Sequence, residues 1–204
     1  MASTAVRSVI FDLGGVVLDW NSRRILERCY PDPESRAVMR AALFRHPDWR
    51  LFDRGAMTEA ALLARLHERT GRTPAELSHL LDVVRDSLVP KPAMVALLRA
   101  LNAGGVPLYC LSNMPGSVYA HIRARYDFWD TFRGIVISAE VGMLKPEPEI
   151  FEHLLKRYAL QGNETVFIDD HPPNVDGARS VGLQAILFED EDQCRNELAA
   201  WLGV

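Results

Sequence analysis

One apolar stretch near the amino terminus, VIFDLGGVVLDW from Val9 to Trp20, constrains the fold more than any other part of the sequence. It begins as a run of strand length that delivers one carboxylate, Asp12, into a loop opening with Leu13, Gly14 and Gly15. A buried strand that ends on an acid and then glycines places the acid at the edge of a sheet, where open α/β folds bind ligands. A paired structural acid is the alternative interpretation, because buried carboxylates are rarely left unpaired.

Strand-like and helix-like segments alternate along most of the chain, which predicts a Rossmann-like α/β core with a parallel sheet and helices on both faces. The expected strands are Val6–Phe11, Val106–Leu111, Gly134–Ser138, Thr165–Ile168 and Gln184–Phe188. The expected helices of this core are Lys91–Ala103, Pro115–Arg125, Pro148–Tyr158, Asn174–Val181 and Asp192–Trp201.

Residues 21–89 break this alternation, because the pattern there is helical and contains no convincing strand. Residue types that cap helix N-termini stand at Asn21, Asp32, Thr58 and Thr73. We therefore predict a helical cap over residues 21–89, inserted into a core made of residues 1–20 and 90–204. The aromatic residues that could line a pocket facing the core, or simply pack within the lobe, are Trp20, Phe44, Trp49 and Phe52.

Composition argues against several classes of partner. The 204 residues are 48% hydrophobic and 25% charged, which is ordinary for a globular protein, and the net charge of −4 gives no electrostatic reason to expect nucleic acid or an anionic membrane. No segment approaches the ~18 apolar residues of a membrane span, and the amino terminus does not read as a signal peptide. Cys29, Cys110 and Cys194 lack CxxC spacing, so we expect reduced thiols and a cytoplasmic protein.

Polar residues also follow the second and third expected strands. Ser112 and Asn113 come directly before a helix start, where a hydroxyl and backbone amides suit an anion, although a helix cap without a ligand is the alternative. Lys145 follows the third strand in a loop bounded by glycine and proline. A positioned charge and a solvated lysine both remain open at that position.

The fourth expected strand ends on two adjacent acids, Asp169 and Asp170, with Asn174 close behind them. Neighbouring carboxylates repel each other unless they share a cation or a proton. A hard metal with oxygen ligands, most simply Mg²⁺, would remove that repulsion. Capping of the following helix is the alternative role for these side chains.

These four segments resemble, in order, the motifs of the haloacid dehalogenase-like hydrolase superfamily. The segments are FDLGG with Asp12, LSN with Ser112, LKP with Lys145, and IDD with Asp169 and Asp170. The lobe after the first strand is similar to the helical cap of that superfamily. The first motif is similar to that of small bacterial sugar-phosphate phosphatases, including glucose-1-phosphate phosphatases.

The resemblance implies a Mg²⁺-dependent phosphomonoester hydrolase that acts on small phosphorylated metabolites. In the implied mechanism Asp12 attacks phosphorus and forms an aspartyl-phosphate, which water then hydrolyses. Ser112 and Asn113 would hold the phosphoryl group. Lys145 would neutralise Asp12 against the substrate dianion, because two anions at ~4 Å repel by several kcal/mol in a partly dry site.

The resemblance also implies a metal site. Mg²⁺ would bind the Asp12 carboxylate, the Gly14 carbonyl and Asp170. Asp169 would bind the metal through a water molecule or would tune the direct ligands without touching the metal. Asn174 would orient the acidic loop.

One position departs from the superfamily pattern. Most of its phosphatases carry a second aspartate two residues after the nucleophile, as general acid and then base, and this chain has Gly14 there. General acid–base help is typically worth about 10²–10⁴-fold, so we expect a preference for good leaving groups such as those of sugar-1-phosphates and acyl phosphates. Asp19 and His46 are candidates for a replacement acid, with surface or capping roles as the alternatives.

Two other functions stay open at this point. A 2-haloacid dehalogenase would use Asp12 to displace halide from carbon without a metal, and a non-catalytic regulatory protein would keep only the phosphate pocket. A phosphotransferase is a further variant, since an aspartyl-phosphate can pass its group to a second hydroxyl. The cap favours a small-molecule ligand, and the sequence leaves monomer and homodimer open.

Overall fold

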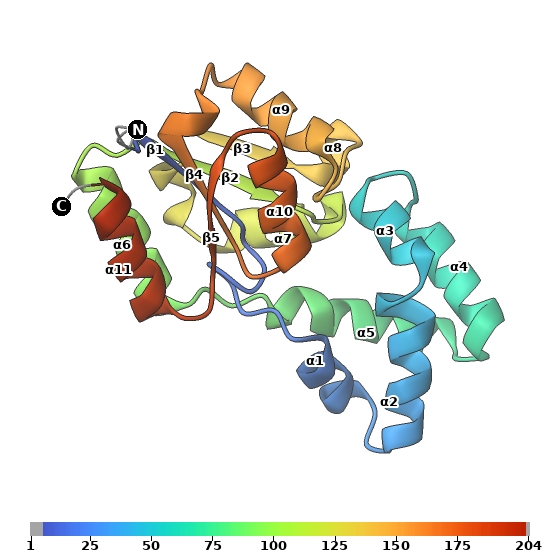
Figure 1. Ribbon diagram of the computed structural model, residues 1–204. Helices are drawn as coiled ribbons and strands as arrows, with labels where there is room; N and C mark the ends of the chain where they lie inside the picture. The colour runs from blue at the N-terminus through green and yellow to red at the C-terminus, as the bar shows by residue number, and fades with distance from the viewer. Residues whose placement is uncertain (1–5, 203–204) are drawn as a thin grey trace.

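A computed structural model describes residues 6–202 and has the expected architecture, a Rossmann-like α/β core with a helical lobe inserted after the first strand (Figure 1). Five parallel strands form one sheet in the order β3-β2-β1-β4-β5. The strands are β1 (Ser8–Phe11), β2 (Leu108–Ser112), β3 (Gly134–Ile137), β4 (Thr165–Asp169) and β5 (Gln184–Leu187). Each expected strand is present, with ends that differ by at most two residues.

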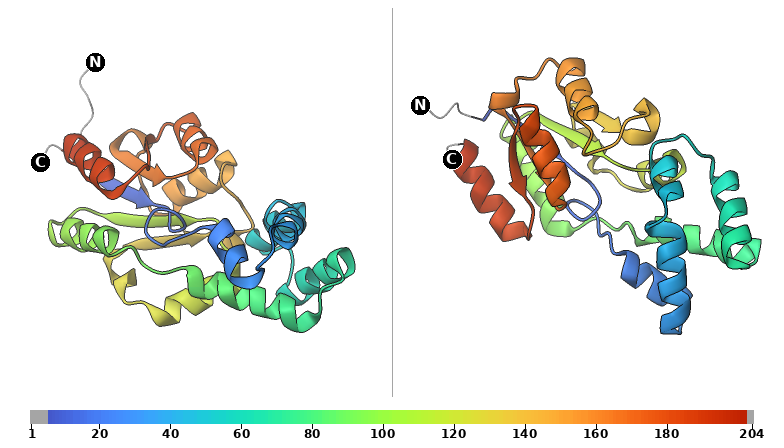
Figure 2. Two further views of the ribbon diagram at one scale, coloured as in Figure 1. Left: turned by 90° about the horizontal axis from the view of Figure 1, so that it is seen from below. Right: turned by 45° about the vertical axis from the view of Figure 1, so that its right-hand side comes forward.

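Alternate residues of the strands face opposite sides of the sheet, as the pleat requires. In β1, Val9 and Phe11 belong to one buried apolar cluster and Ile10 belongs to another. Helices that contribute to the first cluster are α6 (Pro92–Ala103), α7 (Gly116–Arg125) and α11 (Glu191–Leu202). Helices that contribute to the second are α9 (Pro148–Arg157) and α10 (Pro172–Ser180). The sheet therefore has helices on both faces, as the two views of Figure 2 show.

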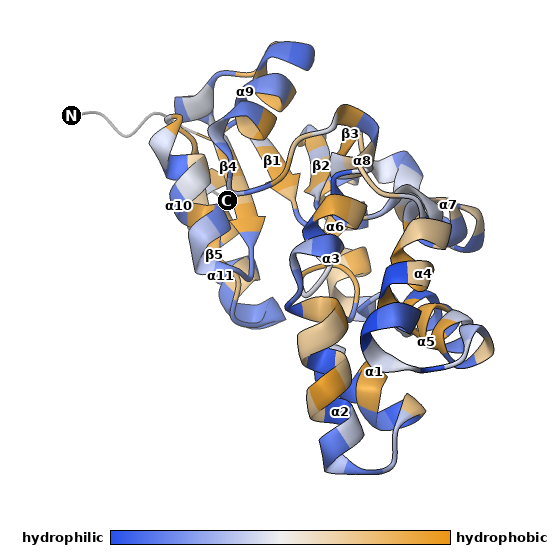
Figure 3. Cartoon of the chain, turned by 90° about the vertical axis from the view of Figure 1, so that its right-hand side faces the viewer, coloured by the Kyte–Doolittle hydropathy of each residue, from blue (hydrophilic) through white to orange (hydrophobic). Residues whose placement is uncertain are grey.

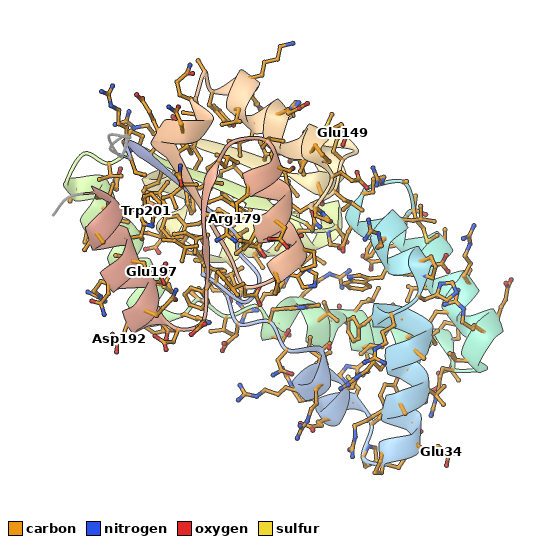
Figure 4. The ribbon with its side chains drawn as sticks, viewed as in Figure 1. Glu34, Glu149, Arg179, Asp192, Glu197 and Trp201 are labelled. Carbon is orange, nitrogen blue, oxygen red and sulfur yellow. The ribbon has the colours of Figure 1, made fainter. Side chains whose placement is uncertain are left out.

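Shorter elements complete the core: η2 (Phe128–Thr131), α8 (Ser138–Val141) and η3 (Gly162–Glu164). Trp201 of α11, labelled in Figure 4, packs against the first apolar cluster, which supports an internal role for this side chain. Cys29, Cys110 and Cys194 are free thiols. Within residues 6–202, no helix is long and apolar enough to cross a membrane.

The lobe between β1 and β2 is helical throughout, and residues 21–89, all of them described, contain no strand. Its elements are α1 (Ser22–Cys29), α2 (Pro33–Met39), the π-helix η1 (Arg40–Phe44), α3 (Pro47–Asp53), α4 (Glu59–Thr70) and α5 (Pro74–Ser87). The four expected N-caps, Asn21, Asp32, Thr58 and Thr73, each accept a backbone N–H from the first turn of their helix.

The lobe has an apolar core of its own, separate from the two clusters on the sheet. Figure 3 shows orange, hydrophobic segments both in the strands and along the lobe helices. Two crossing segments join lobe and core: Asp19 N–H donates to Val89 O at 2.8 Å, and Lys91 N–H donates to Val17 O at 2.9 Å. These features support the division at residues 20/21 and 89/90, which stays a prediction.

Candidate active site

The sheet changes its winding direction beside β1, and this places the polar strand ends together. The chain runs from β1 to β2 and β3 on one side, then returns to add β4 and β5 on the other side. Ligands of open α/β sheets bind at such a switch point, outside the carboxyl ends of the strands. Asp12 directly follows β1 and Asp169 ends the adjacent strand β4, so both acids lie at that point.

A cavity of about 340 Å³ opens at this edge between core and lobe. From the core it is lined by Asp12, Gly14, Ser112, Asn113, Lys145, Asp170 and Asn174, among others. From the lobe and its junctions it is lined by Trp20, Trp49, Arg50, Asp53, Val84 and Leu88. Thus all the predicted site residues except Asp169 line one cavity, and Asp169 lies fully buried behind it.

Lys145 is the cation at the centre of this arrangement. Its Nζ lies 2.8 Å from Oδ1 of Asp12, and it donates to Oδ2 of Asp169 at 2.6 Å and to the carbonyl of Leu111 at 3.0 Å. Burial lowers the pKa of Lys145, but the facing carboxylates of Asp12 and Asp169 raise it more, so the ammonium stays charged. The solvated-lysine interpretation is wrong, because the side chain is buried.

Asp12 is buried at the floor of the cavity. Burial raises its pKa to about 7, and the nearby Lys145 ammonium lowers it while the Asp169 carboxylate raises it further. Its Oδ1 lies 2.8 Å from Nζ of Lys145 and has no other polar partner among residues 6–202. A buried carboxylate that is incompletely paired is unfavourable, and additional positive charge beside it would lower that cost.

Asp170 faces Asp12 across the first loop. Gly15 has a φ of +84°, and a Cβ at this glycine would lie 2.2 Å from Oδ2 of Asp170, so the carboxylate rests directly against the loop backbone. Partial burial and the neighbouring Asp169 raise the pKa of Asp170. Carboxylate oxygens of Asp12, Asp169 and Asp170 lie within 4.8 Å of one another, a spacing and donor set that fit a hard cation such as Mg²⁺.

The two acids of the fourth motif differ in their surroundings. Both oxygens of Asp169 are already engaged: Nδ2 of Asn174 donates to each at 3.0 Å, and His171 N–H donates to Oδ1 at 2.8 Å. The ammonium of Lys145 also donates to Asp169. Asp169 is therefore a hub that holds Lys145 and the acidic loop, which leaves Asp170 as the more open carboxylate.

Ser112 and Asn113 lie at the end of β2. The helix-cap interpretation of Ser112 is wrong, because α7 begins four residues later at Gly116 and has Pro115 at its N-cap. Asn113 grips the backbone of Lys145 from both sides, its Nδ2 donating to the carbonyl and its Oδ1 accepting from the N–H, each at 2.9 Å. The Asn113 side chain thus fixes the Lys145 loop.

Residues 6–182 match the haloacid dehalogenase-like hydrolase family. The chain belongs to this family. Its fold and family therefore agree with the expectation from the four motifs, and the prediction of a hydrolase of this family is confirmed.

Several relatives share most of the chain. A sesquiterpene phosphatase of Aspergillus oryzae is 30% identical over 202 residues, covering 98% of each protein. A drimenol cyclase of Aspergillus calidoustus is 29% identical over 97% of this chain, which spans 37% of that longer protein.

Solved structures of the family share the fold. A family enzyme of Bacteroides thetaiotaomicron, in complex with magnesium and inorganic phosphate, superposes with a TM-score of 0.73 at 22% identity, covering 93% of this chain and 98% of that one. The L-2-haloacid dehalogenase of Xanthobacter autotrophicus gives a TM-score of 0.67 at 17% identity, covering 96% of this chain and 83% of the other. At these identities the likeness concerns the fold alone.

Neither residue suggested as a replacement acid lies in the cavity. Asp19 is exposed beside the crossing segments, and Nδ1 of His46 accepts from Asp48 N–H at 3.2 Å as the N-cap of α3. Both suggestions are therefore wrong, and the capping alternative for His46 is the observed one.

Helix α3 instead supplies cavity residues that the sequence analysis missed, namely Arg50 and Asp53. Their signal was available in principle, since Trp49, Arg50 and Asp53 lie within one turn of a helix that a proline opens. Of the four lobe aromatics, Trp20 and Trp49 line the cavity, whereas Phe44 and Phe52 pack against Trp49.

Proposed function

We propose that this protein is a Mg²⁺-dependent phosphomonoesterase in which Asp12 is the nucleophile. The observation that carries the proposal is the Asp12 carboxylate on the cavity floor, ion-paired to buried Lys145 and facing Asp170. Membership of the haloacid dehalogenase-like hydrolases and the phosphatase among the relatives support the same reaction.

The first step forms a bond between an Asp12 oxygen and phosphorus while the bond from phosphorus to the leaving oxygen breaks. Lys145 neutralises the nucleophile so that it can approach a phosphate dianion. Ser112, with the backbone amide of Asn113, holds a phosphoryl oxygen. In the second step water attacks phosphorus, inorganic phosphate leaves and Asp12 is restored.

Asp12, the carbonyl of Gly14 and Asp170 would hold the metal. When bound, Mg²⁺ supplies positive charge that orients the phosphoryl group and stabilises the charge that develops on it. Asp169 acts behind these residues, because its oxygens are committed to Lys145, Asn174 and the backbone of the acidic loop.

The wall around the leaving group favours an apolar alcohol. Away from the predicted site residues the cavity is lined mainly by apolar side chains, with Arg50 and Asp53 among the polar exceptions, and the apolar residues include Trp20, Trp49, Leu88, Met114 and Val118. Hydroxyls of a sugar would meet few hydrogen-bonding partners against such a wall, whereas an apolar chain would be stripped of water there. We therefore propose that phosphate esters of small apolar alcohols are better substrates than sugar phosphates, in line with the sesquiterpene phosphatase among the relatives.

Phosphate release from a substrate panel tests both parts of this proposal. The panel contains farnesyl phosphate, hexyl phosphate, glucose-1-phosphate, acetyl phosphate and p-nitrophenyl phosphate, each with Mg²⁺ and with EDTA. We expect metal-dependent release that is fastest for the apolar esters. Preference for glucose-1-phosphate would restore the original sugar-phosphate expectation, and halide release from 2-chloropropionate without phosphate release would replace the phosphatase with a dehalogenase. Phosphate binding without turnover of any compound would favour a regulatory role.

A cytoplasmic location and a monomeric or homodimeric state stay predictions of the sequence. Cell fractionation and sedimentation velocity would test them.

A further inference from the structure

The carboxyl end of helix α3, in the lobe, contributes an acid to the lining of the cavity. Asp53, the last residue of α3, lines the same cavity as Asp12. Among the described residues 6–202, no hydrogen bond or ion pair engages its carboxylate. A cavity-facing carboxyl group without a structural partner is available for chemistry.

Backbone contacts between lobe and core fix the place of Asp53. Oγ of Ser138, at the start of α8, donates to the carbonyl of Asp53 at 2.5 Å and also accepts from Met114 N–H at 2.8 Å. The Asp53 backbone is therefore tied to the ends of β2 and β3. Figure 1 shows α3 of the lobe lying beside α8 of the core. We call this contact between α3 and α8 the seam.

The two residues after Asp53 strengthen the same seam. The guanidinium of Arg54 pairs with Glu147 and donates to the carbonyl of Gly142 at 3.0 Å. Gly55 approaches so closely that a Cβ there would lie 2.5 Å from the carbonyl oxygen of Ala139. The closed lobe thus holds the Asp53 backbone in one position over the strand ends.

We propose that Asp53 is the general acid of the first step and the general base of the second. It would replace the aspartate that most phosphatases of the superfamily carry at the position of Gly14. This inference rests on the proposed phosphomonoesterase activity. It assigns to the lobe a catalytic residue that is present in the site only when lobe and core are docked.

The other titratable groups in the cavity are unsuited to this role. Lys145 is committed to Asp12 and Asp169, and the guanidinium of Arg50 does not release a proton in proteins. Asp170 is the proposed metal ligand. His171 directly follows the proposed metal ligand Asp170 in the chain and its side chain is exposed.

The electrostatic surroundings of Asp53 agree with a proton-carrying role. Burial raises the pKa of Asp53 to about 8, against the lowering effects of Arg50 on its own helix and of Lys145 on the core, and Asp12 raises it further. The carboxyl group is therefore protonated near neutral pH, as a general acid must be.

The proton balance of the two steps is simple. As the bond between phosphorus and the leaving oxygen breaks, the Asp53 carboxyl group gives its proton to that oxygen, so the product leaves as an alcohol. In the second step the Asp53 carboxylate takes a proton from the water that attacks the aspartyl-phosphate. Inorganic phosphate leaves and both Asp12 and Asp53 regain their starting states.

Replacement of Asp53 by asparagine keeps the shape of the side chain and removes the carboxyl proton that would be transferred. The loss should depend on the leaving group, because an alkoxide needs a proton and p-nitrophenolate does not. For Asp53→Asn we expect kcat/KM with hexyl phosphate to fall by about 10²–10⁴-fold and kcat/KM with p-nitrophenyl phosphate to fall by less than about tenfold. The comparison uses kcat/KM because this constant reports the formation of the aspartyl-phosphate, whereas kcat of both substrates also contains the shared hydrolysis step. Asp82→Asn, an exposed acid-to-amide change on α5, is the matched control and should alter neither rate.

Two additional readouts separate acid catalysis from a structural effect. The decline of kcat/KM for hexyl phosphate above about pH 8 should disappear in Asp53→Asn. Gly14→Asp should restore part of the lost activity in the Asp53→Asn background, since a Cβ at Gly14 meets only ordinary contacts with Trp20, at 3.6 Å.

Three results would overturn the assignment: equal losses of kcat/KM on both substrates, no loss on either, or a wild type that hydrolyses only the nitrophenyl ester. A folded wild type inactive on every phosphate would instead overturn the proposed function itself, and with it the acid–base role of Asp53. Unfolding curves for Asp53→Asn distinguish a rate effect from misfolding.

Discussion

The Lys145 ammonium lies 2.8 Å from Oδ1 of Asp12, and both side chains are buried at the floor of the cavity. A charge pair out of water is held in place only when further bonds satisfy both partners. Asp169 and the carbonyl of Leu111 provide those bonds on the lysine side, while Oδ1 of Asp12 has no further polar partner in the described part of the chain. This asymmetry leaves the carboxylate as the reactive partner and makes the lysine its fixed support.

Removal of the cation should damage both stability and activity. Lys145→Met leaves Asp12 and Asp169 buried together without their counter-charge, so we expect a loss of roughly 3 kcal/mol in the free energy of unfolding and no measurable turnover. Urea unfolding and phosphate release measure the two effects. Lys156→Met on the exposed side of α9 is the control, for which we expect a change within about 0.5 kcal/mol. A stable, active Lys145→Met enzyme would remove the lysine from the mechanism.

Gly15 should be required for the approach of Asp170. Gly15→Ala introduces strain at a φ of +84° and pushes a Cβ against the Asp170 carboxylate, so the concentration of Mg²⁺ for half-maximal activity should rise at least about tenfold. Gly71→Ala is the matched control, because Gly71 also has a positive φ of +68° but has nothing within 4 Å of the added Cβ. It should lose about 1 kcal/mol of stability and keep its metal response. Identical metal titrations for the two variants would contradict the proposed site.

The seam beside Asp53 should affect turnover more than stability. Arg54→Ala removes the contacts with Glu147 and Gly142 that dock α3 on the core, and partly exposed pairs of this kind contribute about 0.2–1 kcal/mol. We expect kcat/KM to fall about two- to fivefold, with a smaller change in the unfolding midpoint. Arg99→Ala, which removes an exposed ion pair with Asp127 away from the cavity, should leave kcat/KM unchanged. Equal kinetics for both variants would argue against the docked lobe as the active form.

Asp53 should also lower stability as the pH rises. Its pKa is raised on folding from 3.8 to about 8, so the folded form binds a proton that the unfolded chain loses. This contribution is complete below pH 3.8 and is lost as pH increases through about 8. Relative to the wild type, Asp53→Asn should therefore gain stability between pH 5 and pH 8, on the order of 1 kcal/mol after allowance for solvent screening. Urea unfolding at both pH values, in EDTA, measures the difference, and a pH-independent difference would refute the raised pKa.

Core elements were predictable from sequence because each strand is a short apolar run that ends on a polar residue. Asp12, Ser112 and Asp169 each mark the carboxyl end of a parallel strand in the sequence. Parallel strands bring their carboxyl ends to the same edge of the sheet. The helix expected from Asn174 begins two residues earlier, at Pro172, because proline fits the first position of a helix.

The lobe was less predictable, and the reason is physical. Its helices could be recognised from their caps, but which of their faces meets the sheet edge depends on tertiary docking. Asp53 reaches the cavity because Ser138 and Gly55 hold α3 against α8, a relation between residues more than 80 positions apart in the chain. The structural role of Asp48 also depends on tertiary packing, because this buried acid in α3 forms ion pairs with Arg65 and Arg69 of α4.

The most direct test of the central claim is a rapid acid quench during turnover of p-nitrophenyl phosphate with Mg²⁺, followed by peptide mass spectrometry. The account predicts one transient phosphoryl group on the peptide that contains Asp12, and no such adduct in Asp12→Asn. Steady release of phosphate without a phosphorylated enzyme, or a phosphoryl group on another residue, would contradict it.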